Sequence, residues 1–179
     1  MTSRPNASGD RGPLTERRSA PVVNRRTSPD ALAVAYTYLN RRERTVSETR
    51  ARLERADFDA GAVDAAIAEL LDLGYLDDGR YARVFAQDKR ALESWGSERI
   101  SRELAGRGVE RELIEAALAQ AGGDGPSDEH ERAVELLRSR FGGGPADLRD
   151  RDRALGVLIR KGYDGETAYD AVRAWAAGA

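Results

Sequence analysis

The chain has 179 residues, of which 40% are hydrophobic, 34% charged and 6% aromatic. It contains no cysteine and one histidine, His130, which excludes disulfides, thiolate metal sites and a histidine-rich metal centre. No apolar stretch approaches the roughly 18 residues of a transmembrane span, and the N-terminus has no apolar signal core. Alanine, leucine, glutamate and arginine are abundant and favour helices, so we expect a soluble, cytoplasmic, all-α protein.

Residues 1–29 are predicted to be a disordered, basic tail. They contain four prolines, and six arginines against two acidic residues give them a net charge of +4. A segment without helical or strand periodicity buries too little apolar surface to offset the entropy of ordering it. Two interpretations stay open: the tail holds nucleic acid or an acidic partner loosely, or it is a solvated segment with no specific role.

Residues 30–78 are predicted to form a first three-helix unit. Asp30 is expected to cap a helix that runs to about residue 42. Thr45 and Glu48 have the spacing of a capping box, which predicts the start of a second helix. The third helix has apolar residues at the i, i+3, i+4, i+7, i+8 spacing, and Gly74 follows as its terminator. Its apolar stripe is Val63, Ala66, Ile67, Leu70 and Leu71.

The pattern restarts after Asp78, a second expected N-cap, and residues 79–121 are predicted to form a second unit. Its helices are expected at about 80–93, from Ser97 to a glycine-rich stop, and from Glu110 onward. Its expected inward-facing residues are Tyr81, Val84, Phe85, Ala91, Leu92, Ile100, Leu104, Leu113, Ile114, Ala117 and Leu118.

Residues 122–179 are predicted to be a linker followed by a third unit. The glycine-rich run 122–126 marks the linker, and a second break at 142–145 separates the first two helices of this unit. The expected core residues of its three helices are Val134, Leu137 and Phe141, then Leu155, Leu158 and Ile159, then Ala168, Val172 and Trp175.

The three units are copies of one pattern. Four apolar residues spaced 5, 5 and 4 apart occur in each unit, and successive units start 51 and 54 residues apart. Because each unit is small, neighbouring units must help to bury its apolar faces, which predicts an elongated array of tandem repeats. The matched residues are Leu53, Phe58, Val63 and Ile67; Leu104, Val109, Ile114 and Leu118; and Leu158, Tyr163, Ala168 and Val172.

No catalytic, metal or cofactor site is predicted. His130 lies in a charged helix start and is expected at the surface. Asp77 and Asp78 fit a helix cap better than a metal or acid–base site. The glycine runs lack the lysine and Ser/Thr of a phosphate loop. We therefore expect a protein that is not an enzyme.

The middle unit is the least acidic part of the body. The three units carry net charges of −5, +1 and −2, in chain order. The helical spacing of the arginines places some of them on shared faces. Two interpretations stay open, a surface for DNA or an acidic protein and a solvated face with intrahelical ion pairs. The candidate contact residues are Arg80, Arg83, Arg90, Trp95, Arg99, Arg102 and Arg107.

Two segments of the sequence resemble the RecX family of recombination regulators. Residues 74–82, Gly-Tyr-Leu-Asp-Asp-Gly-Arg-Tyr-Ala, resemble the central signature of that family, and residues 96–118 resemble its continuation. Residues 31–53 are similar to its first repeat, and the third repeat matches more loosely, so that the resemblance covers about 30–178. The signature positions are Gly74, Tyr75, Leu76, Asp77, Asp78, Tyr81, Ala82, Gly96, Leu104 and Gly108.

The resemblance implies tandem three-helix repeats and a non-catalytic modulator of RecA that needs no cofactor. Members of the family bind the RecA–DNA filament in its helical groove and typically inhibit ATP hydrolysis, strand exchange and co-protease activity, which modulates DNA repair and homologous recombination. The expected partners are RecA and the RecA–DNA filament, with weak direct DNA binding, no membrane and a monomeric chain. For Asp77 and Asp78 we expect capping and joining of repeats. The alternative is a helical protein that binds nucleic acid directly through the basic tail and the middle repeat.

Overall fold

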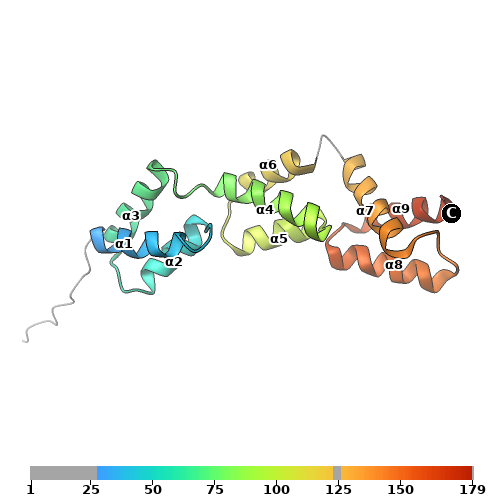
Figure 1. Ribbon diagram of the computed structural model, residues 1–179, viewed down its shortest axis with the longest axis horizontal. Coiled ribbons are helices and arrows are strands. Elements are labelled where there is room, and N and C mark those ends of the chain that lie inside the picture. Colours follow the sequence, from blue (N-terminus) through green and yellow to red (C-terminus); the bar gives the residue numbers. More distant parts are fainter. Residues whose placement is uncertain (1–27, 123–125, 179) are drawn as a thin grey trace, which may run out of the picture.

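The computed structural model describes residues 28–122 and 126–178, and the secondary structure of these residues is nine α-helices (Figure 1). The helices form repeat 1 (α1–α3), repeat 2 (α4–α6) and repeat 3 (α7–α9), which follow one another along an elongated molecule (Figure 1). The all-α array predicted from the sequence is confirmed. The helices are α1 (Ser28–Leu39), α2 (Val46–Glu54), α3 (Ala60–Asp72), α4 (Asp78–Glu93), α5 (Ser97–Gly106), α6 (Arg111–Gly122), α7 (Pro126–Phe141), α8 (Leu148–Lys161) and α9 (Gly165–Ala177).

The start of α2 is the capping box predicted from the sequence. The Thr45 hydroxyl accepts a hydrogen bond from the Glu48 amide at 3.1 Å, and the Glu48 carboxylate accepts one from the Thr45 amide at 3.3 Å. The prediction for α1 is wrong by three residues at each end. The helix begins at Ser28, with Asp30 inside its first turn, because Pro29 is well tolerated in a first turn. Residues 1–27, most of the predicted tail, and residues 123–125 of the predicted linker lie outside the described residues.

The start of α4 corrects a second prediction. Its N-cap is Asp77, whose carboxylate accepts a hydrogen bond from the Arg80 amide at 2.8 Å. Asp78 is the first residue of the helix and directs its carboxylate elsewhere, to the neighbouring repeat. The sequence alone makes Asp77 and Asp78 equally good N-caps. The hydrogen bond from Val46 of repeat 1 engages the Asp78 carboxylate, and Asp77 is the residue that caps the helix.

Each repeat packs its own small core. The matched apolar residues are buried, except that Leu118 is half-buried. The first helices pack through Ala31, Ala82 and Ala133, which lie 51 residues apart in succession and are fully buried. Small side chains at these positions allow the helix backbone to approach its neighbours closely.

Five side chains expected in the core are exposed, among them the small Ala91 on α4. Leu71 and Ile159 are 46% and 49% exposed, and on α4 Val84 and Leu92 are 41% and 81% exposed. The buried residues of α4 are instead Ala82 and Ala86. Leu71, Leu92 and Ile159 lie near helix ends and fit the 3.6-residue period without reaching the core, because each three-helix core is narrow. Val84 lies in the middle of α4, two residues from the buried Ala82 and Ala86, and therefore on the other side of the helix.

The described residues contain no helix that is both long and apolar enough to cross a bilayer, and no cluster of three metal-ligating side chains. His130 was expected at the surface but is half-buried on α7.

Candidate partner-binding surface and the joints that position it

Repeats 1 and 2 meet where α2 begins, at a contact termed joint 1. The amide of Val46, the first residue of α2, donates a hydrogen bond to the carboxylate of Asp78 at 2.9 Å. The hydroxyl of Thr45 donates to the carbonyl of Arg107 at 2.7 Å. The first amides of a helix have no partner inside it, so a carboxylate from the next repeat satisfies one of them. Asp78 therefore joins the repeats, as expected.

Arg107 and Gly108 complete joint 1. The Arg107 guanidinium donates to the Glu48 carboxylate at 3.3 Å and to the Tyr81 hydroxyl at 3.1 Å. Gly108 has a φ of +77°, and a Cβ at this position would overlap the side chain of Ser47. Both the left-handed backbone and the close approach require glycine.

Repeats 2 and 3 meet at joint 2, where α5 begins. The Ser97 amide donates to the carboxylate of Glu129 on α7 at 2.6 Å. Two backbone bonds add to it: the Gly96 amide donates to the Lys161 carbonyl at 2.9 Å, and the Glu98 amide to the Gly162 carbonyl at 3.1 Å. The turn between α8 and α9 is thereby bonded directly to the start of α5.

Glycines and long basic side chains close joint 2. A Cβ on Gly96 would overlap the backbone of Gly162, and a Cβ on Gly162 would lie 2.6 Å from the Arg99 nitrogen. The Lys161 ammonium donates to the Glu93 carbonyl at 2.5 Å, and Arg99 donates to the Arg160 carbonyl at 3.2 Å.

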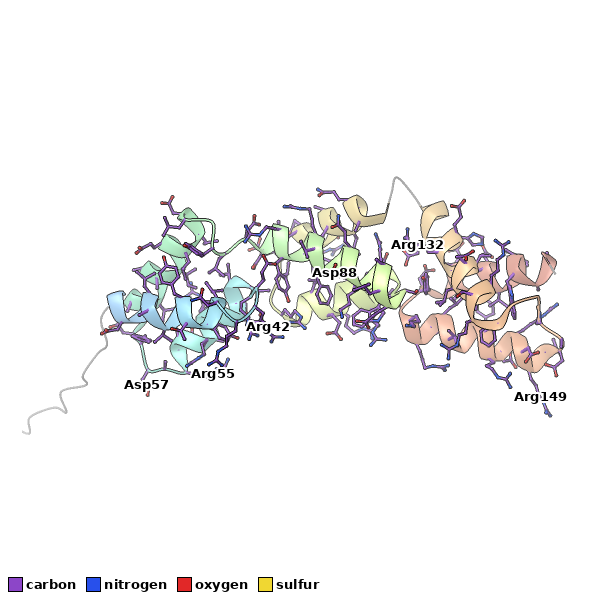
Figure 2. All side chains as sticks on the ribbon, in the orientation of Figure 1. Arg42, Arg55, Asp57, Asp88, Arg132 and Arg149 are labelled. Atoms are coloured by element: carbon purple, nitrogen blue, oxygen red, sulfur yellow. The ribbon has the colours of Figure 1, made fainter. Side chains whose placement is uncertain are left out.

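The two joints are the same contact built twice. The two carboxylates, Asp78 and Glu129, lie 51 residues apart, as do the amides they cap, and Gly108 and Gly162 lie 54 apart. In repeat 1 this left-handed position is Asp57, with φ +60°. Asp57 and Arg149 lie near opposite ends of the array (Figure 2). No repeat precedes Asp57 among the described residues, so its side chain has room.

Burial raises the pKa of the Asp78 carboxyl above its ordinary value. The hydrogen bond from the Val46 amide opposes this shift, and the nearby charges of Asp77, Glu110 and Glu48 add to it. The joint thus holds a partly desolvated carboxylate among other acidic groups.

Four of the candidate arginines are engaged within the protein. Arg80 donates to the Gly74 carbonyl at 3.3 Å and pairs with Glu43 at 3.5 Å. Arg90 donates to the Leu118 carbonyl at 3.0 Å and to the Ser97 hydroxyl at 2.9 Å. Together with Arg99 and Arg107 at the joints, these side chains hold helices together, and they point to different neighbours.

The remaining candidates divide into one buried and two accessible residues. Trp95 is 7% exposed, with the Arg99 guanidinium 3.9 Å from its ring centroid and Phe85 at its edge. Arg83 is half-buried at the edge of joint 1 and Arg102 is exposed on α5. Neither arginine forms a hydrogen bond or ion pair with another described residue. These two side chains are therefore the ones left available to a partner.

The sequence reasoning missed several joint residues. Thr45 was assigned only to its own helix, and Glu129, Lys161 and Gly162 were not singled out. The spacing carried the signal: Asp78 and Glu129, or Gly108 and Gly162, recur at the 51- and 54-residue intervals already seen in the apolar residues.

Comparison with known proteins identifies the family. The model of the first RecX three-helix domain matches residues 31–70, and that of the second matches residues 77–118. Regulatory protein RecX of Xanthomonas campestris pv. campestris (strain B100) is 33% identical over 162 residues, which cover 89% of this chain and 97% of that protein. The chain belongs to the RecX family. RecX of Xanthomonas citri is 35% identical over the same shares of the two chains.

Solved RecX structures share the fold. The crystal structure of RecX from Lactobacillus salivarius superposes with a TM-score of 0.71 at 20% identity, over 83% of this chain and 96% of that one. A second crystal structure of regulatory protein RecX gives a TM-score of 0.63 at 24% identity, over 82% and 73%. Asp78, Gly96 and Gly108, three of the positions on which the sequence resemblance rests, build the joints of this chain.

Proposed function

We propose that this chain binds RecA and RecA–DNA filaments in the cytoplasm, as a monomer, and inhibits the recombinase, ATPase and co-protease activities of RecA. Through this it modulates DNA repair and homologous recombination. Membership of a family of regulatory proteins carries the proposal. The joints support it, because three repeats bonded end to end form an extended body suited to lie along a filament.

The arginines that act in this role are Arg83 and Arg102. Both belong to residues 79–121, the segment of the body with a net charge of +1, and neither is engaged elsewhere in the described residues. Arg80, Arg90, Arg99 and Arg107 contribute indirectly, by holding the repeats in place.

The test is the DNA-dependent ATPase of RecA, measured while the protein is titrated in. We expect inhibition by the wild type, weaker inhibition by Arg83→Glu/Arg102→Glu, and full inhibition by Arg149→Glu, an exposed arginine on repeat 3. If the wild type leaves ATP hydrolysis unchanged over a wide concentration range, the proposal fails. If the double variant, still folded, inhibits as well as the wild type, these two arginines are not the contacts.

Direct binding to nucleic acid is the second candidate, and the free guanidinium groups of Arg83 and Arg102 favour it. Binding to single-stranded DNA without RecA then falls steeply with salt, because phosphate contacts release counterions. Affinity for DNA that is as high without RecA as with it would favour this second function over the first.

A further inference from the structure

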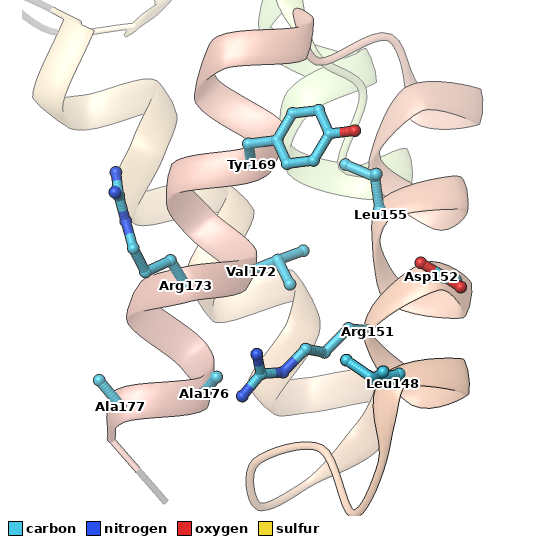
Figure 3. A pocket seen from close by; sticks show the side chains of 9 residues that line it. All are labelled: Leu148, Arg151, Asp152, Leu155, Tyr169, Val172, Arg173, Ala176 and Ala177. Atoms are coloured by element: carbon cyan, nitrogen blue, oxygen red, sulfur yellow. The ribbon is translucent and has the colours of Figure 1, made fainter.

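Repeat 3 carries an open groove between α8 and α9, here termed the terminal groove (Figure 3). Its volume is about 480 Å³ and its walls are mainly apolar. Leu148 and Tyr169 on its rim are 73% and 66% exposed. Arg151 extends from α8 across the groove toward α9 (Figure 3). The residues that define the groove are Leu148, Arg151, Leu155, Tyr169, Val172 and Ala176.

The terminal groove corresponds to the face by which repeat 1 binds repeat 2. Matched positions of repeats 1 and 3 lie 105 residues apart. Four residues that line the terminal groove have counterparts that line the cleft at joint 1. The corresponding pairs are Val46 and Arg151, Ser47 and Asp152, Arg50 and Leu155, and Leu71 and Ala176.

Repeat 2 gives the same correspondence. Ser97 of repeat 2 matches Arg151, and Glu98 matches Asp152. The Ser97 amide donates to the Glu129 carboxylate of repeat 3, and the Glu98 amide donates to the Gly162 carbonyl. Arg151 and Asp152, which match positions that contact the next repeat in repeats 1 and 2, are solvent-exposed in repeat 3. Leu155 and Ala176 are half-buried.

The molecule itself shows what chemistry covers this face. At both joints the first helix of the next repeat brings a carboxylate to the matched position. In repeat 3 the helix starts earlier, so the Arg151 amide is already bonded to the Asp147 carbonyl at 3.4 Å. At joints 1 and 2 the group that binds the carboxylate is the helix amide of Val46 or Ser97. In repeat 3 the exposed guanidinium of Arg151, which has no ion pair with another described residue, can serve in place of that amide. An arriving carboxylate would meet a cation there.

A second copy of this chain does not provide the complementary half. The residue of repeat 1 that matches Gly108 and Gly162 is Asp57, whose Cβ occupies the space where those glycines approach their neighbours. The residue that matches Asp78 and Glu129 is Thr27, which has no carboxylate. The array is therefore not built to continue head to tail.

We propose that the terminal groove binds a helix of a partner protein, with an acidic residue of its first turn paired to Arg151 and an apolar side chain seated between Leu155 and Val172. We take the partner protein to be RecA in its filament, so this inference rests on the proposed function. It adds a protein-binding site on repeat 3, separate from Arg83 and Arg102.

The experiment measures the affinity of the labelled full chain for a RecA filament, assembled on single-stranded DNA with a non-hydrolysable ATP analogue, and for the same DNA alone. The variants are Arg151→Glu and Tyr169→Ser. Their controls are Arg149→Glu, two residues away on α8 but outside the groove, and Leu92→Ser, which changes an apolar residue on α4 that is even more exposed than Tyr169. Melting temperatures verify that all four variants are folded.

We expect Arg151→Glu and Tyr169→Ser each to weaken filament binding about tenfold, with the controls and the affinity for DNA alone unchanged. Filament binding equal to wild type in both groove variants overturns the proposal and leaves the proposed function standing. A parallel loss of affinity for DNA alone overturns it in favour of nucleic acid. A wild-type dimer in sedimentation that Arg151→Glu dissociates overturns it in favour of a second copy. A wild type that does not bind the filament refutes the proposed function, and the groove proposal with it.

Discussion

Joints 1 and 2 hold equivalent surfaces together by different chemistry. Joint 1 relies on side chains: the Thr45 hydroxyl, the Asp78 carboxylate and the Arg107 guanidinium. Joint 2 shares the carboxylate cap but adds two backbone-to-backbone bonds, which Gly96 and Gly162 make possible by their close approach. Both joints need a left-handed glycine at the matched position, Gly108 or Gly162. The remaining bonds come from side chains in joint 1, and in part from the backbone in joint 2.

The largest expected effect is at the glycine of joint 2. Gly162→Ala places a Cβ against Arg99 and forces alanine into the left-handed region at φ +88°, so we expect a loss of about 2–5 kcal/mol in the free energy of unfolding. Asp57, at the matched position of repeat 1, has no preceding repeat to approach among the described residues. Asp57→Gly should therefore change the free energy of unfolding by about 1 kcal/mol or less. Urea unfolding measures both, and equal effects at the two positions would show that the close approach is not what requires glycine.

The next effect is specific to joint 1. Arg107→Ala removes the hydrogen bonds to Glu48 and Tyr81, one of them an ion pair, and should cost about 1–2 kcal/mol of unfolding free energy. Amide hydrogen exchange at the start of α2 should rise, while the start of α5 stays protected. Faster exchange at both joints would mean that Arg107 does not act locally.

The capping carboxylates should behave alike. Asp78→Ala and Glu129→Ala each leave a helix amide unsatisfied, and we expect each to lower the unfolding free energy by about 0.5–2 kcal/mol. Thermal melts measure the loss. If Asp78→Ala melts like the wild type yet no longer acts on RecA, Asp78 is a partner contact and its joining role is wrong.

The pH dependence of Asp78 refines this comparison. Because its folded pKa is raised, Asp78 contributes stability that is fully present below its unfolded pKa and is lost as the pH rises through the raised folded pKa. Asp78→Asn keeps an acceptor for the Val46 amide without a charge, so it should stabilise the fold at neutral pH. That gain should vanish in acid, and thermal melts from pH 3 to 7 measure it; a gain that is constant across this range would contradict the burial account.

The smallest effect concerns the core beside joint 2. Tyr163 is 1% exposed, and its hydroxyl has no hydrogen-bond partner among the described residues. Burial raises its pKa to about 12, so it stays neutral at physiological pH. Tyr163→Phe should stabilise the fold by about 1 kcal/mol or less, since it removes an unsatisfied polar group at nearly constant shape. A loss of stability would reveal a partner for the hydroxyl.

The sequence predicted the three-helix repeats because apolar spacing, caps and glycine stops are local signals. Gly74, the capping box at Thr45 and the break before Ser97 all lie where expected. The joints could not be predicted in the same way. Nothing local distinguishes Asp77, which caps its own helix, from Asp78, which caps a helix 32 residues earlier in the chain.

The candidate arginines show the same limit. Spacing predicted a shared face for Arg80, Arg83 and Arg90, but it could not show that Arg80 turns toward Glu43 and that Arg90 bonds α5 and α6. Only the folded arrangement separates the engaged guanidinium groups from those of Arg83 and Arg102.

The central claim is that the two joints hold the three repeats as one body. Since the chain has no cysteine, spin labels can be attached to cysteines introduced at the exposed positions Ala65 and Arg149, in repeats 1 and 3, and their separation measured by pulsed electron paramagnetic resonance. The account predicts one narrow distance distribution, which broadens on Gly162→Ala. A broad distribution in the otherwise unchanged chain, or one that Gly162→Ala leaves unaltered, would contradict it.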